Sequence, residues 1–148
     1  MVFRSARLNA KTKTYRYRVW NGADPCVFDR KYVFVDRDGI DVAAMNNAAQ
    51  QFIGTHDFSA FCGNKNMKKS TVRTIFQFDI ISMDNEIRFV VTGNGFLQHM
   101  VRIMVGTLIE VGLGERAPES IDALFGGARA EAGFAVPACG LCLMEVTY

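Results

Sequence analysis

The chain has 148 residues, of which 49% are hydrophobic and 11% aromatic, so it can bury the core of one compact domain and is not a disordered polypeptide. Charged residues make up 22% and are spread along the chain, no apolar run is long enough to cross a bilayer, and the first residues lack the layout of a signal peptide, so we expect a cytoplasmic protein without a membrane anchor. The four cysteines include only one C-x-x-C pair, Cys139 and Cys142, so we expect reduced thiols and no metal site.

Basic residues are concentrated at the start of the chain. The net charge is +2, yet the first twenty residues hold six basic and no acidic residues, which leaves the remainder with eleven basic and fifteen acidic residues and a net charge of −4. This asymmetry steers an anionic partner towards one region of the surface, and nucleic acid is the obvious candidate.

Two strands and a helix are predicted in the first third of the chain. Residues 14–20 alternate as in a strand, with Tyr15, Tyr17 and Val19 on one face and Arg16, Arg18 and Trp20 on the other. Residues 32–35 predict a second short strand. Residues 42–52 place hydrophobic residues at spacings of three and four, which predicts a core-facing helix with Asp41 as its N-cap and Gly54 as its end.

A long loop and a hairpin are predicted next. Residues 54–70 have no sustained period and contain three lysines, so we expect a long loop. Residues 72–82 and 86–92 are β-rich and can be joined by a tight turn at Asp84-Asn85. One face of this hairpin is expected to carry Phe76, Phe78 and Ile80, matched by Ile87, Phe89 and Val91.

The last third of the chain predicts two helices and a strand. Gly93 to Gly95 end the hairpin, Phe96 to Val111 predict a helix, Pro118 begins a short helix that ends at Gly126-Gly127, and residues 141–147 return as a strand. The order of elements predicts a single α+β domain over residues 1–148. We expect a mainly antiparallel sheet whose adjacent strands pair through hairpins, with the helices packed on one face.

The helix expected over residues 96–111 is apolar on nearly all sides. Its one polar stripe consists of Gln98, Arg102, Gly106 and Glu110 at four-residue intervals, with His99 beside the first two. A guanidinium is costly to bury alone, so Arg102 must reach water or meet an acid from another segment. From periodicity alone a structural ion pair is favoured over a catalytic role.

Four segments of the chain point to one known family. They are KTYRY at residues 13–17, GTHDFSAF at 54–61, GNGFLQHMVRIMVGTLIEVGLG at 93–114 and PACGLCLMEVTY at 137–148. In this order and at these spacings they resemble the tyrosine-bearing strand, the G-x-H-D-F loop, the signature helix and the closing strand of the tRNA pseudouridine synthase A family. The resemblance covers essentially the whole chain.

The resemblance implies an isomerase that converts uridine to pseudouridine in the anticodon arm of tRNA, at positions 38 to 40, without a cofactor. The family uses an aspartate in an R-T-D-x-G-V loop of its N-terminal half, which attacks or deprotonates the ribose. None of the nine aspartates here has an R-T-D context, so we expect this chain to be the C-terminal domain only, with the catalytic-aspartate domain absent, and to be inactive alone. A homodimer of the full-length enzyme is implied by the resemblance only.

The resemblance also assigns roles to three residues. Arg102 matches the arginine that pairs with the catalytic aspartate, where a cation keeps a partly buried carboxylate ionised. Tyr15 matches the tyrosine that stacks on the flipped uracil, and Leu141 matches the leucine that closes the pocket. Without its acid, Arg102 is expected to face an open, solvent-filled cleft. The basic residues considered for phosphate contacts are Arg7, Lys11, Lys13, Arg16, Arg18, Lys65, Lys68 and Lys69.

Two other functions stay open at the level of sequence. One is a non-catalytic RNA-binding module in which the basic strand binds phosphates and Tyr15 stacks a base. The other is an interaction domain unrelated to RNA. His56 and Asp57 match the family loop without a chemical role that we can argue, and His99 is expected to shape the polar stripe rather than to transfer protons.

Overall fold

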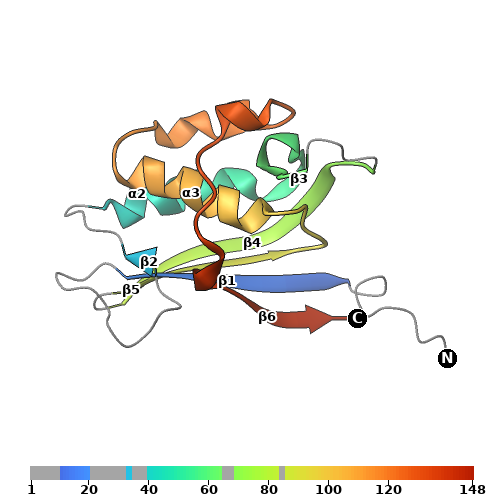
Figure 1. The fold of residues 1–148 in the computed structure, drawn as a ribbon, viewed down its shortest axis with the longest axis horizontal. Coiled ribbons are helices and arrows are strands. Elements are labelled where there is room, and N and C mark those ends of the chain that lie inside the picture. The colour runs from blue at the N-terminus through green and yellow to red at the C-terminus, as the bar shows by residue number, and fades with distance from the viewer. Residues whose placement is uncertain (1–10, 21–32, 35–39, 65–68, 84–85) are drawn as a thin grey trace.

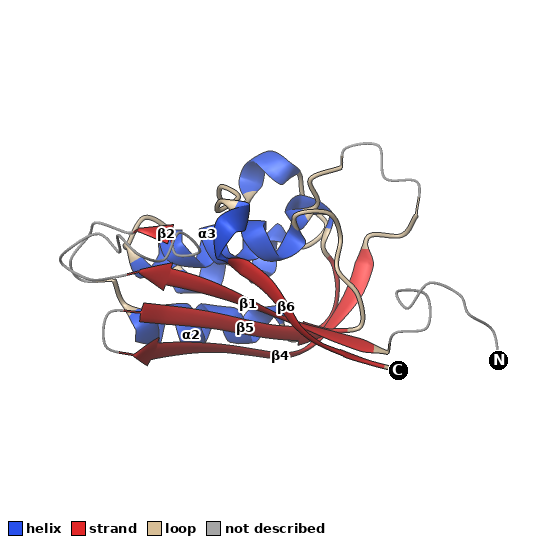
Figure 2. Cartoon of the chain, turned by 60° about the horizontal axis from the view of Figure 1, so that its bottom comes forward, coloured by secondary structure: helices blue, strands red, loops and turns tan. Residues whose placement is uncertain are grey.

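The fold is a single sheet with its helices on one side. The computed structural model describes residues 11–20, 33–34, 40–64, 69–83 and 86–148, so Arg7, Lys65 and Lys68 lie outside the described residues. The described strands follow the order β2-β1-β5-β4-β3, and β6 pairs with β1 off this path. Figure 1 shows α2 and α3 above the sheet, and Figure 2 shows the strands in front of the helices. The predicted α+β architecture is confirmed.

Strand β1 (Thr12–Trp20) carries Tyr15 and pairs with β6, which carries Leu141, so these two strands form one side of the candidate site. Strand β1 pairs antiparallel with β5 (Glu86–Gly93) and with β6 (Leu141–Thr147). The predicted alternation is confirmed, because Tyr17 and Val19 are 0% and 1% exposed under the helices.

Strand β2 (Val33–Phe34) runs parallel to β1, so the hairpin expected between these two strands is wrong. A parallel pair needs a crossover of about a dozen residues. Residues 21–32, which separate the two strands, have that length.

The hairpin of β4 (Val72–Met83) and β5 is antiparallel, as predicted. Its register shifts between Ile75 and Gln77, because Ile75 pairs with Gly93 and Gln77 already pairs with Thr92. The bulge reverses the alternation of the strand. Phe76 is therefore 51% exposed, and the expectation that it shares the buried face of Phe78 and Ile80 is wrong. The turn expected at residues 84–85 lies outside the described residues.

The start of the expected long loop is a strand, β3 (Gly54–Asp57), which pairs antiparallel with the beginning of β4. The loop prediction is wrong here because this edge strand forms through backbone pairing and has no alternation of buried and exposed side chains. Before it, α2 (Val42–Ala49) has the predicted N-cap, since the Asp41 carboxylate accepts a 3.0 Å hydrogen bond from the Ala44 N–H. Gly54 has a φ of +111° and begins β3 instead of capping the helix.

Helix α3 (Met100–Gly112) begins four residues later than the sequence predicts. The Gln98 carbonyl accepts a 2.8 Å hydrogen bond from the Gly63 N–H, and His99 has a left-handed φ of 62°. Both features are incompatible with a helix that begins at Phe96. The short helix expected from Pro118 is instead two 3-10 turns, Pro118–Ser120 and Asp122–Leu124.

Candidate functional site

A small pocket lies between the start of α3 and the strands β1 and β6. Its volume is about 100 Å³, and its lining residues are Tyr15, Phe96, Leu97, His99, Met100, Val101 and Leu141. The rings of Tyr15 and Phe96 meet edge to face with their centres 5.0 Å apart. Leu141 enters the pocket because it pairs with Tyr17, two residues along β1 from Tyr15. Two of the three residues singled out by the family resemblance therefore line one apolar pocket.

Arg102 follows Val101, which lines this pocket, and its side chain is half-buried. Its Nε donates a 2.7 Å hydrogen bond to the Val136 carbonyl, and its own carbonyl accepts a 3.1 Å hydrogen bond from the Val136 N–H. Among the described residues, the ion pairs join Arg18 and Arg88 to Glu86 and Arg116 to Glu110, and none involves Arg102. The structural ion pair that periodicity favoured for Arg102 is therefore not found in that part of the chain.

Tyr17 connects the core beneath the pocket to the segment that holds Arg102. Its hydroxyl donates a 2.6 Å hydrogen bond to the Pro137 carbonyl, and its side chain is 0% exposed. Burial raises the pKa of Tyr17 well above its usual range, the nearby Cys139 raises it further, and the Arg102 cation opposes both. Tyr17 is therefore a neutral hydrogen-bond donor near neutral pH.

A larger pocket of about 480 Å³ lies elsewhere, between Ser59, Cys62 and Thr71 on one side and residues 127–130 on the other. It contains none of the residues expected to bind a base, so the smaller pocket is the candidate site. Within the described ranges, no group of three or more His, Cys, Asp or Glu side chains could hold a metal ion. The helices of the same ranges are all too short or too polar to span a membrane.

Comparison with known proteins identifies the family. Residues 48–148 match a family model described as tRNA pseudouridine synthase. The chain belongs to the tRNA pseudouridine synthase family.

The chain is also similar in sequence to curated members of this family. A tRNA pseudouridine synthase A from Anoxybacillus flavithermus is 45% identical over 97% of this chain and 58% of its own length. Those from Syntrophotalea carbinolica and Staphylococcus carnosus are 42% and 43% identical, over 97% and 95% of this chain and 57% and 53% of their own lengths. The chain thus spans a little over half the length of these pseudouridine synthases.

Two residues of the G-x-H-D-F segment have structural roles that the sequence did not reveal. The His56 ring stacks on Phe125 with ring centres 4.0 Å apart and planes 5° apart. The Asp57 carboxylate accepts hydrogen bonds from the Ser59 N–H and the Thr71 hydroxyl. His56 thus packs the end of β3 against Phe125, and Asp57 holds the residues that follow β3 and those that precede β4.

His99 is exposed at the pocket, in the left-handed conformation. A Cβ atom on Gly63 would meet its Nδ1 at 2.6 Å, so the imidazole packs directly on the Gly63 backbone. The ring thus packs beside the start of α3, and its expected part in shaping the polar stripe stays a prediction.

The described basic residues that were expected to contact phosphates fall on different faces of the sheet. Lys13 shares the helix-facing side of β1 with Tyr15, and Lys11 and Lys69 are exposed near the ends of β1 and β4. Arg16 and Arg18 lie on the face without helices. The Arg18 Nε is 2.8 Å from a Glu86 carboxylate oxygen. The fold therefore does not bring all of these residues to the pocket.

One cation near the site was not identified from the sequence. Arg73 lies in β4, and a Cβ atom on Gly95 would come within 3.5 Å of its side chain. Its Nη1 donates 2.7 Å hydrogen bonds to the carbonyls of Ser70 and Val72. Pairing of β4 with β5 brings this arginine beside the segment that leads to the pocket, so no local sequence pattern could have identified it.

Proposed function

We propose that this chain carries the base-binding pocket and the arginine of a tRNA pseudouridine synthase that isomerises uridine in the anticodon arm of tRNA, at positions 38 to 40. The observation that supports it most directly is the convergence of Tyr15, Leu141 and the first turn of α3 on one pocket, whose lining includes Val101, the residue before Arg102. Membership of the pseudouridine synthase family gives this convergence its chemical meaning.

The proposed chemistry needs a base outside its helical stack. A flipped uracil stacks on the flat face of Tyr15, with Leu141 closing the pocket beside it. Uridine and pseudouridine are isomers, so no oxidant, reductant or cofactor is consumed. The bond from the ribose C1′ to the base N1 breaks and a bond from C1′ to the base C5 forms. The C5 proton then leaves and N1 takes up a proton, so the atoms balance.

Arg102 supplies the positive charge that the catalytic carboxylate needs in this chemistry. Its Nε is held by Val136, and no acid in the described ranges pairs with its guanidinium. We propose that the two outer nitrogens pair with a catalytic aspartate from the further length that the relatives possess. A cation beside that carboxylate would keep it ionised despite its burial. On this proposal the chain alone is inactive.

The proposal extends to the basic residues around the site and to the complete enzyme. Lys11, Lys13 and Lys69, with Arg7, Lys65 and Lys68 outside the described residues, are proposed to contact tRNA phosphates. Arg16 and Arg18 remain candidates on the opposite face of the sheet. The complete enzyme is proposed to act in the cytoplasm as a homodimer.

The decisive experiment measures pseudouridine at positions 38 to 40 of an unmodified tRNA. The chain is assayed alone and together with the amino-terminal part of the Anoxybacillus flavithermus relative, and the complemented assay is repeated with Arg102→Gln. We expect activity only from the complemented, unsubstituted chain. Full activity of the chain alone would refute its proposed dependence on a second part. Salt-sensitive tRNA binding without isomerisation in either assay would instead support the non-catalytic RNA-binding module.

A further inference from the structure

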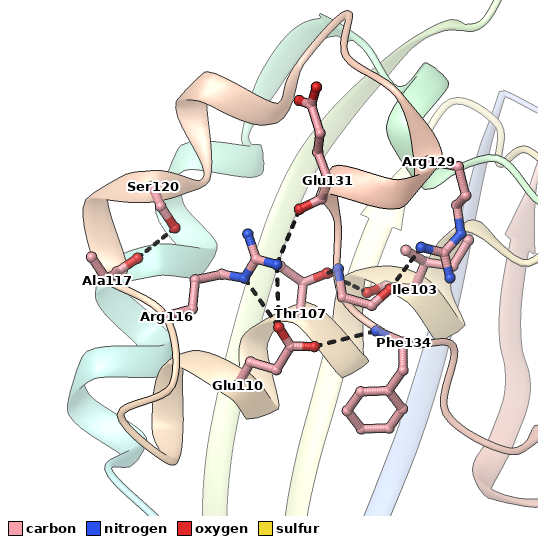
Figure 3. Close-up of polar contacts among 10 residues, drawn as sticks. Ile103, Thr107, Glu110, Arg116, Ala117, Ser120, Arg129, Glu131 and Phe134 are labelled. Carbon is pink, nitrogen blue, oxygen red and sulfur yellow. Dashed lines mark hydrogen bonds and ion pairs between the residues drawn. The ribbon is translucent and has the colours of Figure 1, made fainter.

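A short segment crosses α3 beside Arg102 and then leads into β6. We call this segment, residues 132–137, the strap. It follows the 3-10 turn Arg129–Glu131 and leads through the turn Ala138–Gly140 into β6. Figure 3 shows Thr107 and Glu110 of α3 with their side chains directed at its beginning.

The first anchor of the strap is Thr107, which is 0% exposed. Its hydroxyl donates a 2.7 Å hydrogen bond to the Ile103 carbonyl and accepts one of 2.9 Å from the Gly133 N–H. The strap comes so close to α3 here that a Cβ atom on Gly106 would lie 1.7 Å from the Phe134 carbonyl oxygen. Backbone thus packs on backbone, with no room for displacement towards the helix.

The second anchor is Glu110, whose two carboxylate oxygens have different partners. One oxygen accepts a 3.3 Å hydrogen bond from the Phe134 N–H. The other accepts hydrogen bonds of 3.2 Å from both Nε and Nη2 of Arg116, and that Nη2 also donates to the Glu131 carbonyl at 3.1 Å. One carboxylate therefore joins the strap to the loop that follows α3.

The far end of the strap holds Arg102 and Tyr17. The Val136 N–H donates to the Arg102 carbonyl, and the Val136 carbonyl accepts from the side-chain Nε of Arg102. The next carbonyl, of Pro137, accepts from the Tyr17 hydroxyl. Val136 is three residues from Gly133, a span of at most about 10 Å. Because the guanidinium is planar, a fixed Nε–H direction orients the whole group.

We infer that Thr107 and Glu110 are positioning residues for pseudouridine formation, which act by fixing the strap so that the Val136 carbonyl orients the Arg102 guanidinium. The inference rests on the proposed function, in which Arg102 pairs with a carboxylate. Neither residue lines the pocket. Their loss therefore lowers kcat and has little effect on the KM for tRNA.

The test compares disruptive and conservative substitutions at both anchors. Thr107→Val removes the acceptor of the Gly133 N–H, and Thr107→Ser retains it. Glu110→Ala removes both carboxylate contacts, whereas Glu110→Gln retains a side-chain oxygen. The matched control is Ser120→Ala, which removes a hydrogen bond to the Ala117 carbonyl away from the strap. If Thr107→Val does not fold, the two Glu110 variants decide.

Two measurements are needed. The NMR signal of the Arg102 Nε–H, recorded in the 148-residue chain, reports its orientation without requiring activity. The second measurement is kcat and KM in the complemented assay. In the disruptive variants we expect a displaced or broadened Arg102 signal and a kcat lower by roughly tenfold, the scale on which small misplacements act. The conservative variants and Ser120→Ala should stay close to the unsubstituted protein.

An unchanged Arg102 signal in both disruptive variants would overturn the inference, whatever their activity. A displaced signal with unchanged kcat, or with a change in KM alone, would overturn it too, because the orientation of Arg102 would then not limit the reaction. If the unsubstituted chain forms no pseudouridine in any assay, the proposed function fails. The NMR signal then decides by itself whether the anchors orient Arg102.

Discussion

Arg102 and Val136 are joined by two hydrogen bonds that run in opposite directions. The arginine Nε donates to the Val136 carbonyl at 2.7 Å, and the Val136 N–H donates to the arginine carbonyl at 3.1 Å. A backbone carbonyl thus holds the side chain that the proposed mechanism needs, which leaves its outer nitrogens for a carboxylate. The hydrogen-bonding geometry of the Arg102 guanidinium can therefore be tested separately from its positive charge.

Arg102→Lys is expected to lower kcat in the complemented assay by roughly a hundredfold, because a lysine keeps the charge but has neither the Nε donor nor the planar fork. Arg102→Gln should lower it further, since the charge is lost as well. Circular dichroism and the midpoint of thermal unfolding should change little in both variants, because the side chain is only half-buried. Arg102→Lys with kcat within threefold of the unsubstituted chain would show that the Nε donor and the planar fork are not needed. The same result for Arg102→Gln would argue against a paired carboxylate.

Tyr15→Leu is expected to weaken productive tRNA binding because it removes the aromatic face from the pocket. Stacking of a base on an aromatic side chain contributes about 1–3 kcal/mol, which corresponds to a roughly 5-fold to 150-fold rise in KM. Tyr15→Phe is the matched control, since it keeps the ring and its contact with Phe96. A Tyr15→Leu variant with the KM of the unsubstituted chain would contradict the stacking role.

The sequence predicted the elements with strong periodicity and missed those that depend on distant partners. The apolar surface of α3 and the faces of β1 were predictable because burial repeats along each element. The strand character of residues 54–57 was not, because it comes from pairing with β4. Phe76 was assigned to the wrong face because a one-residue bulge leaves no mark on the pattern.

In the candidate site too, the sequence indicated the features with a local pattern and missed those that depend on distant segments. Arg102 stood out in the sequence because a charge interrupts an apolar helix, whereas Tyr15 and Leu141 were singled out only by the family resemblance. Periodicity could not indicate that the strap covers the polar stripe of α3, since residues 132–137 form neither helix nor strand. Gly106 and Glu110 look like part of a solvent-facing stripe, but they are contacts with the strap.

Gly106→Ala should destabilise the fold, because its Cβ would lie 1.7 Å from the Phe134 carbonyl oxygen and either the strap or α3 must move. Such overpacking costs about 1–3 kcal/mol. The matched control is Gly95→Ala, whose Cβ would make ordinary contacts of 3.5 Å with Arg73. Urea unfolding of the two variants and the unsubstituted chain measures the difference. Equal free energies of unfolding for all three would mean that the strap does not pack against α3 as described.

Lys13→Gln should reduce the salt dependence of tRNA binding more than Arg18→Gln does. Each phosphate contact contributes about 0.7–0.9 to the slope of log K against log salt concentration. Lys13 lies on the same side of β1 as Tyr15, whereas the Arg18 guanidinium on the opposite face is engaged by Glu86. Filter binding at four or more salt concentrations gives the slopes. A larger loss of slope in Arg18→Gln would place the tRNA on the face without helices.

The stability of the chain should fall in alkali partly through Tyr17. Its folded-state pKa is raised above the ordinary value of 10.0, chiefly by burial. A tyrosine whose pKa is higher in the folded than in the unfolded state contributes its full stability below the unfolded-state pKa. This contribution is lost as the pH rises from the unfolded-state pKa towards the folded-state pKa. At pH 7, Tyr17→Phe should be less stable by about 1 kcal/mol, because the hydrogen bond to Pro137 is lost.

Between about pH 9 and 11 the Tyr17 hydroxyl ionises in the unfolded chain but stays protonated in the folded chain. This difference lowers the free energy of unfolding of the unsubstituted chain and has no counterpart in Tyr17→Phe. The stability difference between the two should therefore shrink and then reverse in sign. Urea unfolding across this pH range measures it, and Tyr148→Phe, at a residue that is 61% exposed, serves as the control. A constant difference from pH 7 to 11 would show that the Tyr17 hydroxyl is not held in a buried hydrogen bond.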